Sequence, residues 1–284
     1  MSASDESKEK KPIAFASGPA ESVKDWTSYR LLVAEAARRG QLRGANLAHA
    51  NLDGIDLSGC DLTGAHLEGA TLAGARLVGT RLSMADLRGA RLSRVEADGL
   101  LLDGARLEEA NFEMAVLVGA DFASAEAAGA SFPCAYLRGA RAVGASFTRT
   151  NFTDAGLQGV QAGDADFSMA DLTAADLTGI DASNAVFDGA AMVDAFLADA
   201  DLSGAEMKSA DLSGADFKNA TLQGTDLSQA RLCGALVHEA TFMRCSLRGA
   251  DLRGSEINLD RFMECDWSGA MFSKDPDGDE NPDA

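Results

Sequence analysis

The run Ala-Asn-Leu-Ala-His-Ala-Asn-Leu-Asp-Gly-Ile-Asp-Leu-Ser-Gly at residues 45–59 repeats every five residues, and the same pattern extends over residues 40–274. Counted from Leu42 to Phe272, the stretch holds 47 pentads, of which 37 have Leu or Phe at the centre. Ala stands two positions before the centre in 33 pentads, and Gly stands two positions after it in 24. A period of five matches neither the 3.6-residue period of a helix nor the two-residue period of a strand, so the pattern predicts a solenoid.

Each pentad supplies one large and one small inward position. The large central side chain fills the axis, Ala lets the backbone approach closely, and Gly suits a corner that needs a positive φ. A second spacing, of twenty residues, appears in columns of central residues: Ala142, Ala162 and Ala182; Phe147, Phe167 and Phe187; Phe112, Phe132 and Phe152. Small and bulky columns side by side keep the volume of each layer constant, which indicates four pentads per coil.

The units Ala-Asn-Leu-Asp-Gly (50–54), Ala-Asp-Phe-Ser-Met (165–169) and Ala-Asp-Leu-Ser-Gly (210–214) resemble the A(D/N)LxX unit of the pentapeptide repeat family. The resemblance covers residues 40–274. It implies an all-β solenoid, a right-handed quadrilateral β-helix with four pentads per coil, and therefore about twelve coils in this chain. It implies a fold much more specifically than it implies a function.

The chain divides into four segments: a flexible tail at 1–20, an N-terminal capping helix at 21–39, the solenoid at 40–274 and an acidic disordered tail at 275–284. Ser22 with Asp25 resembles a capping box, and Gly40 is a stop signal. The helix has an apolar side made by Val23, Trp26, Val33 and Ala37. We expect this helix to lie over the open first coil, because a solenoid must cover its apolar end. A helix on a membrane surface is the weaker alternative.

The formal net charge is −19, and its distribution is uneven. Residues 150–217 hold 13 acidic side chains and one basic one, Lys208. We define the acidic belt by eleven of these side chains: Asp154, Asp164, Asp166, Asp171, Asp176, Asp181, Asp194, Asp199, Asp201, Asp211 and Asp216. Asp before the central Leu is also the ordinary residue of the repeat, so the belt has a structural as well as a functional interpretation.

Two apolar features break the polar pattern of the outward positions. The twenty-residue spacing places five apolar residues on one outer face, a candidate partner patch: Val116, Val118, Tyr136, Phe196 and Leu236. The last coil carries unusually large apolar groups, a candidate dimer end: Phe262, Met263, Trp267, Met271 and Phe272. No helix follows that coil in the sequence, so we expect a second copy to cover it with two-fold symmetry, unless the tail or another protein does so.

Enzyme signatures are absent from the sequence, and we expect no catalytic residue, no cofactor and no metal site. His49 and His66 fall on one face in successive coils at different pentad positions, and His238 is isolated. The five cysteines are expected to be free thiols: Cys60, Cys245 and Cys265 at inward positions, Cys134 and Cys233 at outward or corner positions. Cys245 and Cys265 lie one coil apart and should stack. With no apolar run long enough to span a membrane and no signal peptide, a bacterial-type cytoplasmic protein is expected.

The pattern favours a non-enzymatic scaffold that presents an acidic rod-shaped surface to a protein partner, without direct binding of nucleic acid or membrane. Two alternatives come from the family resemblance. Some members mimic DNA and bind or protect DNA gyrase or a related type II topoisomerase, and the acidic belt resembles those rods. Other members act as adaptors for bacterial secretion or envelope machines, although no residue here selects that function.

Overall fold

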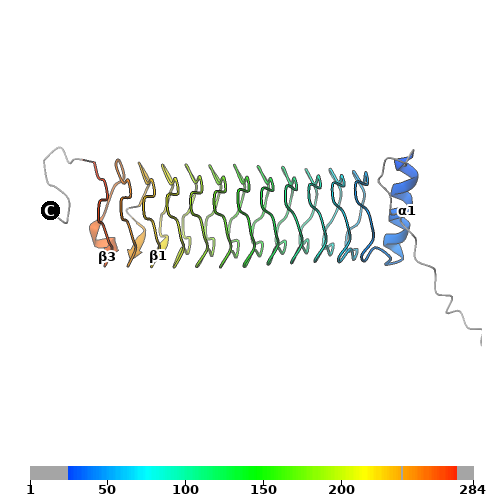
Figure 1. Ribbon diagram of the computed structural model, residues 1–284, viewed down its shortest axis with the longest axis horizontal. Helices are drawn as coiled ribbons and strands as arrows, with labels where there is room; N and C mark the ends of the chain where they lie inside the picture. Colours follow the sequence, from blue (N-terminus) through cyan, green and yellow to red (C-terminus); the bar gives the residue numbers. More distant parts are fainter. Residues whose placement is uncertain (1–24, 238, 274–284) are drawn as a thin grey trace, which may run out of the picture.

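A computed structural model describes residues 25–237 and 239–273. Figure 1 shows a straight rod of stacked coils with one helix, α1 (Trp26–Arg38), across its N-terminal end. Parallel bridges join outward ladder residues that are twenty positions apart along the rod, from Asn46↔His66 to Asp251↔Met271. The twenty-residue coil predicted from the columns of central residues is therefore confirmed.

The hydrogen bonds of one pentad explain why Asp or Asn precedes the central residue. The amide hydrogens of residues 166–170 donate, in order, to Ala145 O (2.9 Å), Val186 O (2.6 Å), Asp166 Oδ1 (2.8 Å), Asp188 O (2.9 Å) and Phe167 O (3.0 Å). Four of the acceptors are backbone carbonyls, in the neighbouring coils or the same turn. The fifth is the carboxylate of Asp166, which receives the amide of Ser168 in an Asx turn. The ladder carboxylate thus pairs a turn amide that has no carbonyl partner.

The central residues form one continuous apolar core along the axis. Phe132 stacks on Phe112 with ring centroids 4.8 Å apart and on Phe152 at 5.0 Å. These separations equal the spacing of neighbouring strands, so the rings pack face to face as the coils stack. Ala142, at 3% exposure, and Ala162 are buried as the sequence predicts.

Nearly all the described corners of the coils have left-handed backbone. Gly takes most of these positions, and within residues 25–237 and 239–273 twenty residues other than Gly also have positive φ there, between 54° and 60°. Side chains on such corners often lie over a Gly of the next coil. Asp194 is an example, because a Cβ on Gly214 would clash with its Oδ1.

Near the C-terminus the bridges extend into a parallel sheet in the order β1-β2-β3. Its strands are β1 (Thr221–Gln223), β2 (Thr241–Met243) and β3 (Phe262–Met263), and η2 (Leu259–Arg261) precedes the last of them. The register of twenty persists, with Phe242 opposite Phe262.

Helix α1 begins later than the sequence analysis placed it. Asp25 is the N-cap, and its carboxylate accepts the amide hydrogen of Thr27 (2.9 Å) and the hydroxyl of Ser28 (2.5 Å). The proposed capping box, in which Ser22 is the cap, is therefore wrong, because Asp25 itself satisfies the first-turn donors. Val33 and Ala36 are fully buried in the core cluster. The predictions for residues 1–24, including Val23, and for the acidic tail from residue 275 fall outside the described residues.

Candidate functional site

The structure places the five residues of the candidate partner patch on one flat side of the rod, which we call the apolar face. Bridges connect four of them in one column, from Val116↔Tyr136 through Asp176↔Phe196 to Asp216↔Leu236, and Val118 follows Val116 in the same pentad. The exposed fractions are 41% for Val118, 59% for Tyr136, 50% for Phe196 and 45% for Leu236, and Val116 is half-buried.

Two further side chains extend this surface, and the sequence analysis missed both. Val78 is exposed and stands at the position of Val118, two coils earlier. Met114 is exposed at the corner that borders Val116, where its φ is 55°. The twenty-residue spacing, counted back from Val118, identifies Val78. Met114 stands at a corner position, so only an inspection of the corner residues would have identified it.

The corner beside the apolar face retains side chains over six successive coils. The residues are Arg94, Met114, Cys134, Asp154, Ala174 and Asp194, with φ from 54° to 57°. Left-handed backbone costs a residue other than Gly about 1–2 kcal/mol, and Gly stands at this corner in the coils before and after the run. Strained backbone concentrated beside an exposed apolar surface is a physical sign of a functional site.

Between Tyr136 and Phe196 the apolar face carries a glycine and polar side chains instead of large apolar groups. Gly156 has no positive φ that would require glycine, and a Cβ there would lie 3.1 Å from Oε1 of Gln158. The same side chain donates through Nε2 to Asp176 Oδ2 at 2.6 Å. Burial raises the pKa of the Asp176 carboxyl, but hydrogen bonds from Thr178 and Gln158 outweigh it, so the pKa lies below its usual value. The site thus offers a fixed negative charge between Tyr136 and Phe196.

The acidic belt separates into two structural classes. Seven of its residues are ladder residues whose Oδ1 accepts the amide two positions later: Asp166, Asp171, Asp176, Asp181, Asp201, Asp211 and Asp216. The other four stand at corners with φ of 56° to 58°: Asp154, Asp164, Asp194 and Asp199. The turn geometry accounts for the first class, and Asp tolerates the backbone of the second.

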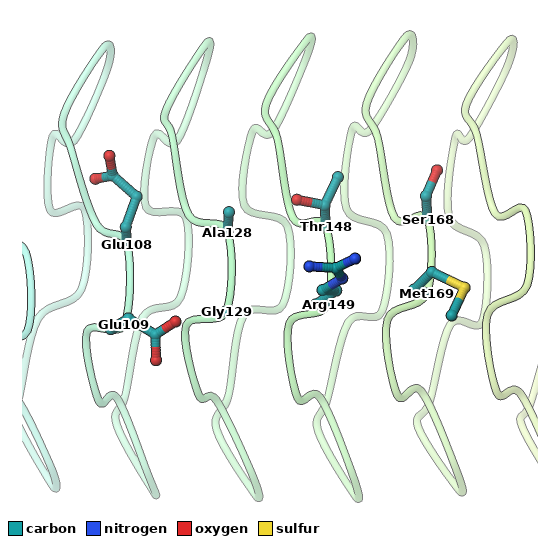
Figure 2. A pocket seen from close by; sticks show the side chains of 8 residues that line it. All are labelled: Glu108, Glu109, Ala128, Gly129, Thr148, Arg149, Ser168 and Met169. Atoms are coloured by element: carbon teal, nitrogen blue, oxygen red, sulfur yellow. The ribbon is translucent and has the colours of Figure 1, made fainter.

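A groove of about 720 Å³ runs along a different edge of the rod. Figure 2 shows the eight residues that line it over four successive coils: Glu108, Glu109, Ala128, Gly129, Thr148, Arg149, Ser168 and Met169. Ala128 and Gly129 provide almost no side chain there, and the carboxylate of Glu109 lies over Gly129. Both signs of charge and an apolar thioether face it, so the groove suits polar contacts along the rod.

The C-terminal end presents an aromatic surface within the described residues. Phe262 stacks on Phe242 at 4.2 Å, and contacts continue from Phe262 to Trp267 (4.8 Å) and from Trp267 to Phe272 (5.4 Å). Phe262, Trp267 and Phe272 occupy central positions and are half-buried. Met263 and Met271 point outward instead and are 44% and 45% exposed. The predicted contact between two copies at this end stays a prediction.

The described residues hold no group of three or more His, Cys, Asp or Glu that could bind a metal ion. His49 and His66 are both exposed, with His49 lying against Gly69, whereas His238 lies outside the described part of the chain. All five cysteines are free thiols, with Cys245 buried and Cys134 exposed. No helix within the described ranges has the length and apolar character needed to cross a bilayer.

Comparisons with known proteins agree with this architecture. The family described as pentapeptide repeats matches in 8 copies over residues 41–77, 55–94, 101–133, 134–168, 165–204, 195–234 and 220–258. No match was found among curated proteins.

Solved structures give a similar result. HetL, a pentapeptide repeat protein involved in heterocyst differentiation regulation from the cyanobacterium Nostoc sp. strain PCC 7120, is 31% identical, with a TM-score of 0.71 over 75% of this chain and 94% of HetL. Rfr23 from the cyanobacterium Cyanothece 51142 is 32% identical over 40% of this chain and 63% of its own, with a TM-score of 0.25. QnrB1, a plasmid-mediated fluoroquinolone resistance protein, is 18% identical over 78% of this chain and 92% of its own, with a TM-score of 0.32. With its twenty-residue register, the family match over most of its length and the likeness to HetL, the chain belongs to the pentapeptide repeat family and folds as a right-handed β-helix.

Proposed function

We propose that this chain is a non-catalytic scaffold that binds a protein partner through its apolar face. One observation carries the proposal. Between residues 41 and 237, all exposed large apolar side chains on the flat sides of the rod lie on that face, and the remaining ones, Met84, Met114 and Met169, stand at corners. Exposed apolar groups gathered on one side of a rod are typical of a contact surface.

The spacing of the two aromatic groups on the apolar face indicates what a partner must present. Tyr136 and Phe196 are three coils apart, which is about 14 Å at a strand spacing of ~4.8 Å. An α-helix covers that distance in about ten residues at 1.5 Å per residue. The carboxylate of Asp176 lies between them. A matching partner presents two apolar groups about ten helical residues apart, with a basic group between them.

A photo-cross-linking residue introduced at Tyr136 or Phe196 tests the proposal in the source cell. The matched control is Gln161, an exposed ladder residue on another side. We expect one shared cross-linked protein from positions 136 and 196 and none from 161. The captured protein, once purified, should then lose binding to a variant with Val116→Glu and Tyr136→Glu and retain binding to Gln161→Glu. Equal cross-linking from all three positions would count against the apolar face.

A DNA mimic that binds a type II topoisomerase is the second candidate, supported by the net charge of −19. The ladder geometry weakens it. Asp171 and Asp211 are separated in their ladder column by Ala191, so carboxylates recur in that column only every two coils, about 9.6 Å. Duplex DNA carries one charge per ~1.7 Å of axis. Purified gyrase, assayed for supercoiling with the unmodified chain and with Asp171, Asp194 and Asp211 reversed to Lys, separates the candidates: inhibition by the former alone supports mimicry.

A further inference from the structure

Two cysteines lie next to each other in the last two coils. Ser246 and Asp266 are bridge partners, and the amide of Asp266 donates to the carbonyl oxygen of Cys245 at 2.9 Å. The residues that precede the bridge, Cys245 and Cys265, therefore stack in register on neighbouring strands. Strands in a sheet lie ~4.8 Å apart, and disulfides join Cα atoms about 4.4–6.8 Å apart, so the backbone already places the pair within bonding range.

The two thiols have different environments. Cys245 is 2% exposed, and its thiol donates to the carbonyl oxygen of Leu222 at 2.8 Å. Cys265 is half-buried at the end of the rod, and its thiol has only longer contacts, 3.5 Å to Met263 O and 3.7 Å to Phe242 O. One sulfur is thus enclosed, and the other can be reached by a small molecule.

The same asymmetry affects ionisation. The adjacent Cys245 thiol lowers the pKa of the Cys265 thiol to about 7, while the adjacent Cys265 thiol, together with burial, raises the pKa of Cys245. The carboxylates beside Cys265 are paired, Glu264 with Arg244 at 2.8 Å and Asp266 with Arg248 at 3.9 Å. The arrangement thus favours ionisation of the accessible sulfur over the enclosed one, which is the requirement for a nucleophilic thiol.

Cys60 provides the contrast within the same chain. It also occupies a small inward position, but the residue stacked on it twenty positions later is Thr80, whose hydroxyl donates to Leu57 O. Burial raises the pKa of the Cys60 thiol, and Asp56 raises it further. Cys60 thus occupies the same pentad position as Cys245, but no second thiol is stacked on it.

We propose that Cys245 and Cys265 are a peroxide-sensitive dithiol whose oxidation ties the last coil to the coil before it. The Cys265 thiolate attacks hydrogen peroxide: an S–O bond forms, the O–O bond breaks, and the hydroxide released takes up a proton to become water. The sulfur of Cys245 then attacks the sulfenic acid: the S–S bond forms, the S–O bond breaks, and the second hydroxide leaves as water with the Cys245 proton. Two thiols and one peroxide give one disulfide and two waters, the sulfurs losing the two electrons that the peroxide gains.

Peptide mapping tests the proposal directly. The reduced full-length chain is treated with one equivalent of hydrogen peroxide, blocked with iodoacetamide under denaturing conditions and digested with trypsin. Arg244, Arg248, Arg261 and Lys274 release the two cysteines on separate peptides, 245–248 and 262–274. We expect a disulfide-linked pair of these peptides, while Cys60 remains alkylated. Full alkylation of both Cys245 and Cys265, or a disulfide that joins either one to a different cysteine, would overturn the proposal.

Two variants assign the roles. Cys245→Ser should fold, because Thr225 and Ser255 at equivalent positions donate hydroxyls to Leu202 O and Leu232 O. In this variant Cys265 should stop at the sulfenic acid and be trapped by dimedone. In Cys265→Ala no adduct should form at Cys245. A dimedone adduct at Cys245 in the second variant would reverse the assignment and contradict the proposed mechanism.

Hydrogen exchange gives a readout of the structural consequence. The amides of residues 262–272 should exchange several-fold more slowly in the oxidised chain than in the reduced chain, while those of residues 62–72 stay unchanged. Equal exchange at the C-terminal end in both forms would show that the disulfide does not hold the last coil.

Discussion

The hydroxyl of Thr225 donates a hydrogen bond of 2.8 Å to the carbonyl oxygen of Leu202, twenty-three residues earlier. Both residues are fully buried, and the same carbonyl oxygen also accepts the amide of Ala205 at 3.1 Å. Thr80 and Thr150 repeat this contact with Leu57 and Ala127. The small inward position thus accepts a hydroxyl without leaving it unpaired, which explains how Thr replaces Ala inside an apolar rod.

The contact leads to a stability prediction. Leu202→Ala should lower the free energy of unfolding by about 2–5 kcal/mol, because it leaves a cavity in a core that cannot collapse. Thr225→Val should change it by less than about 1.5 kcal/mol, since Leu202 O keeps the amide of Ala205. Ser203→Ala, half-buried on the outer surface, should be nearly neutral. Urea unfolding measures all three, and equal losses for Leu202→Ala and Ser203→Ala would contradict the register.

The corners give a second prediction from two adjacent alanines. Ala174 has a φ of 55°, so Ala174→Gly should relieve left-handed strain and raise the free energy of unfolding by up to about 1 kcal/mol. Ala175 is fully buried at the next position, and Ala175→Gly should lower it by about 1–2 kcal/mol. Thermal unfolding of both variants is the measurement. A loss of stability in Ala174→Gly would show that the corner is not strained.

Much of this architecture could be predicted because volume and periodicity leave few solutions. The small column from Ala142 and the bulky column from Phe147 indicate four pentads per coil from the sequence alone, and the stacked rings follow that spacing. The start of α1 could not be predicted in the same way, because Ser22 and Asp25 are both good caps and only tertiary packing selects between them.

The candidate site was predicted less completely. The column of Tyr136 and Phe196 follows from counting, but Met114 stands at a corner, where the sequence pattern assigns only a turn. For the acidic belt, the sequence shows the residues but does not distinguish their two roles. Asp181 looks like surface charge in the sequence, whereas in the structure its carboxylate accepts the amide of Ser183 at 3.2 Å. Charge counting cannot separate these two roles.

Acid should weaken the C-terminal coils. Asp251 is 8% exposed and forms two bonds with the Arg253 guanidinium, 2.8 Å from Nε and 2.6 Å from the terminal nitrogen. These bonds hold the pKa of the Asp251 carboxyl far below its usual value. A depressed folded-state pKa stabilises the fold above the unfolded value of about 3.9, and the contribution is lost as pH falls below it.

The measurement is thermal unfolding at pH 7 and pH 3 for the unmodified chain and for Asp251→Asn. The variant should be less stable at pH 7 and should lose less stability between the two conditions. An identical pH dependence in both proteins would show that other carboxylates dominate the acid response.

The aromatic C-terminal end should govern association. If two copies meet there, light scattering should give a dimer mass at micromolar concentration, because the half-buried rings of Trp267 and Phe272 lose their contact with water. Trp267→Asp should shift the mass to that of a monomer, while Gln161→Glu should not. A monomer mass for the unmodified chain over the micromolar range would refute the dimer.

The strict twenty-residue pairing also means that distances along one face of the rod change in steps of one coil. Removing residues 156–175 would join Ala155 to Asp176 with every side chain still on its own face. It would also bring Tyr136 and Phe196 closer by one step of ~4.8 Å. Removing only five residues would instead shift every later side chain to the neighbouring side of the rod. Tyr136 and Phe196 would then no longer share a face. The separation of two contact groups can therefore change while both stay on the same face, but only when whole coils are added or removed.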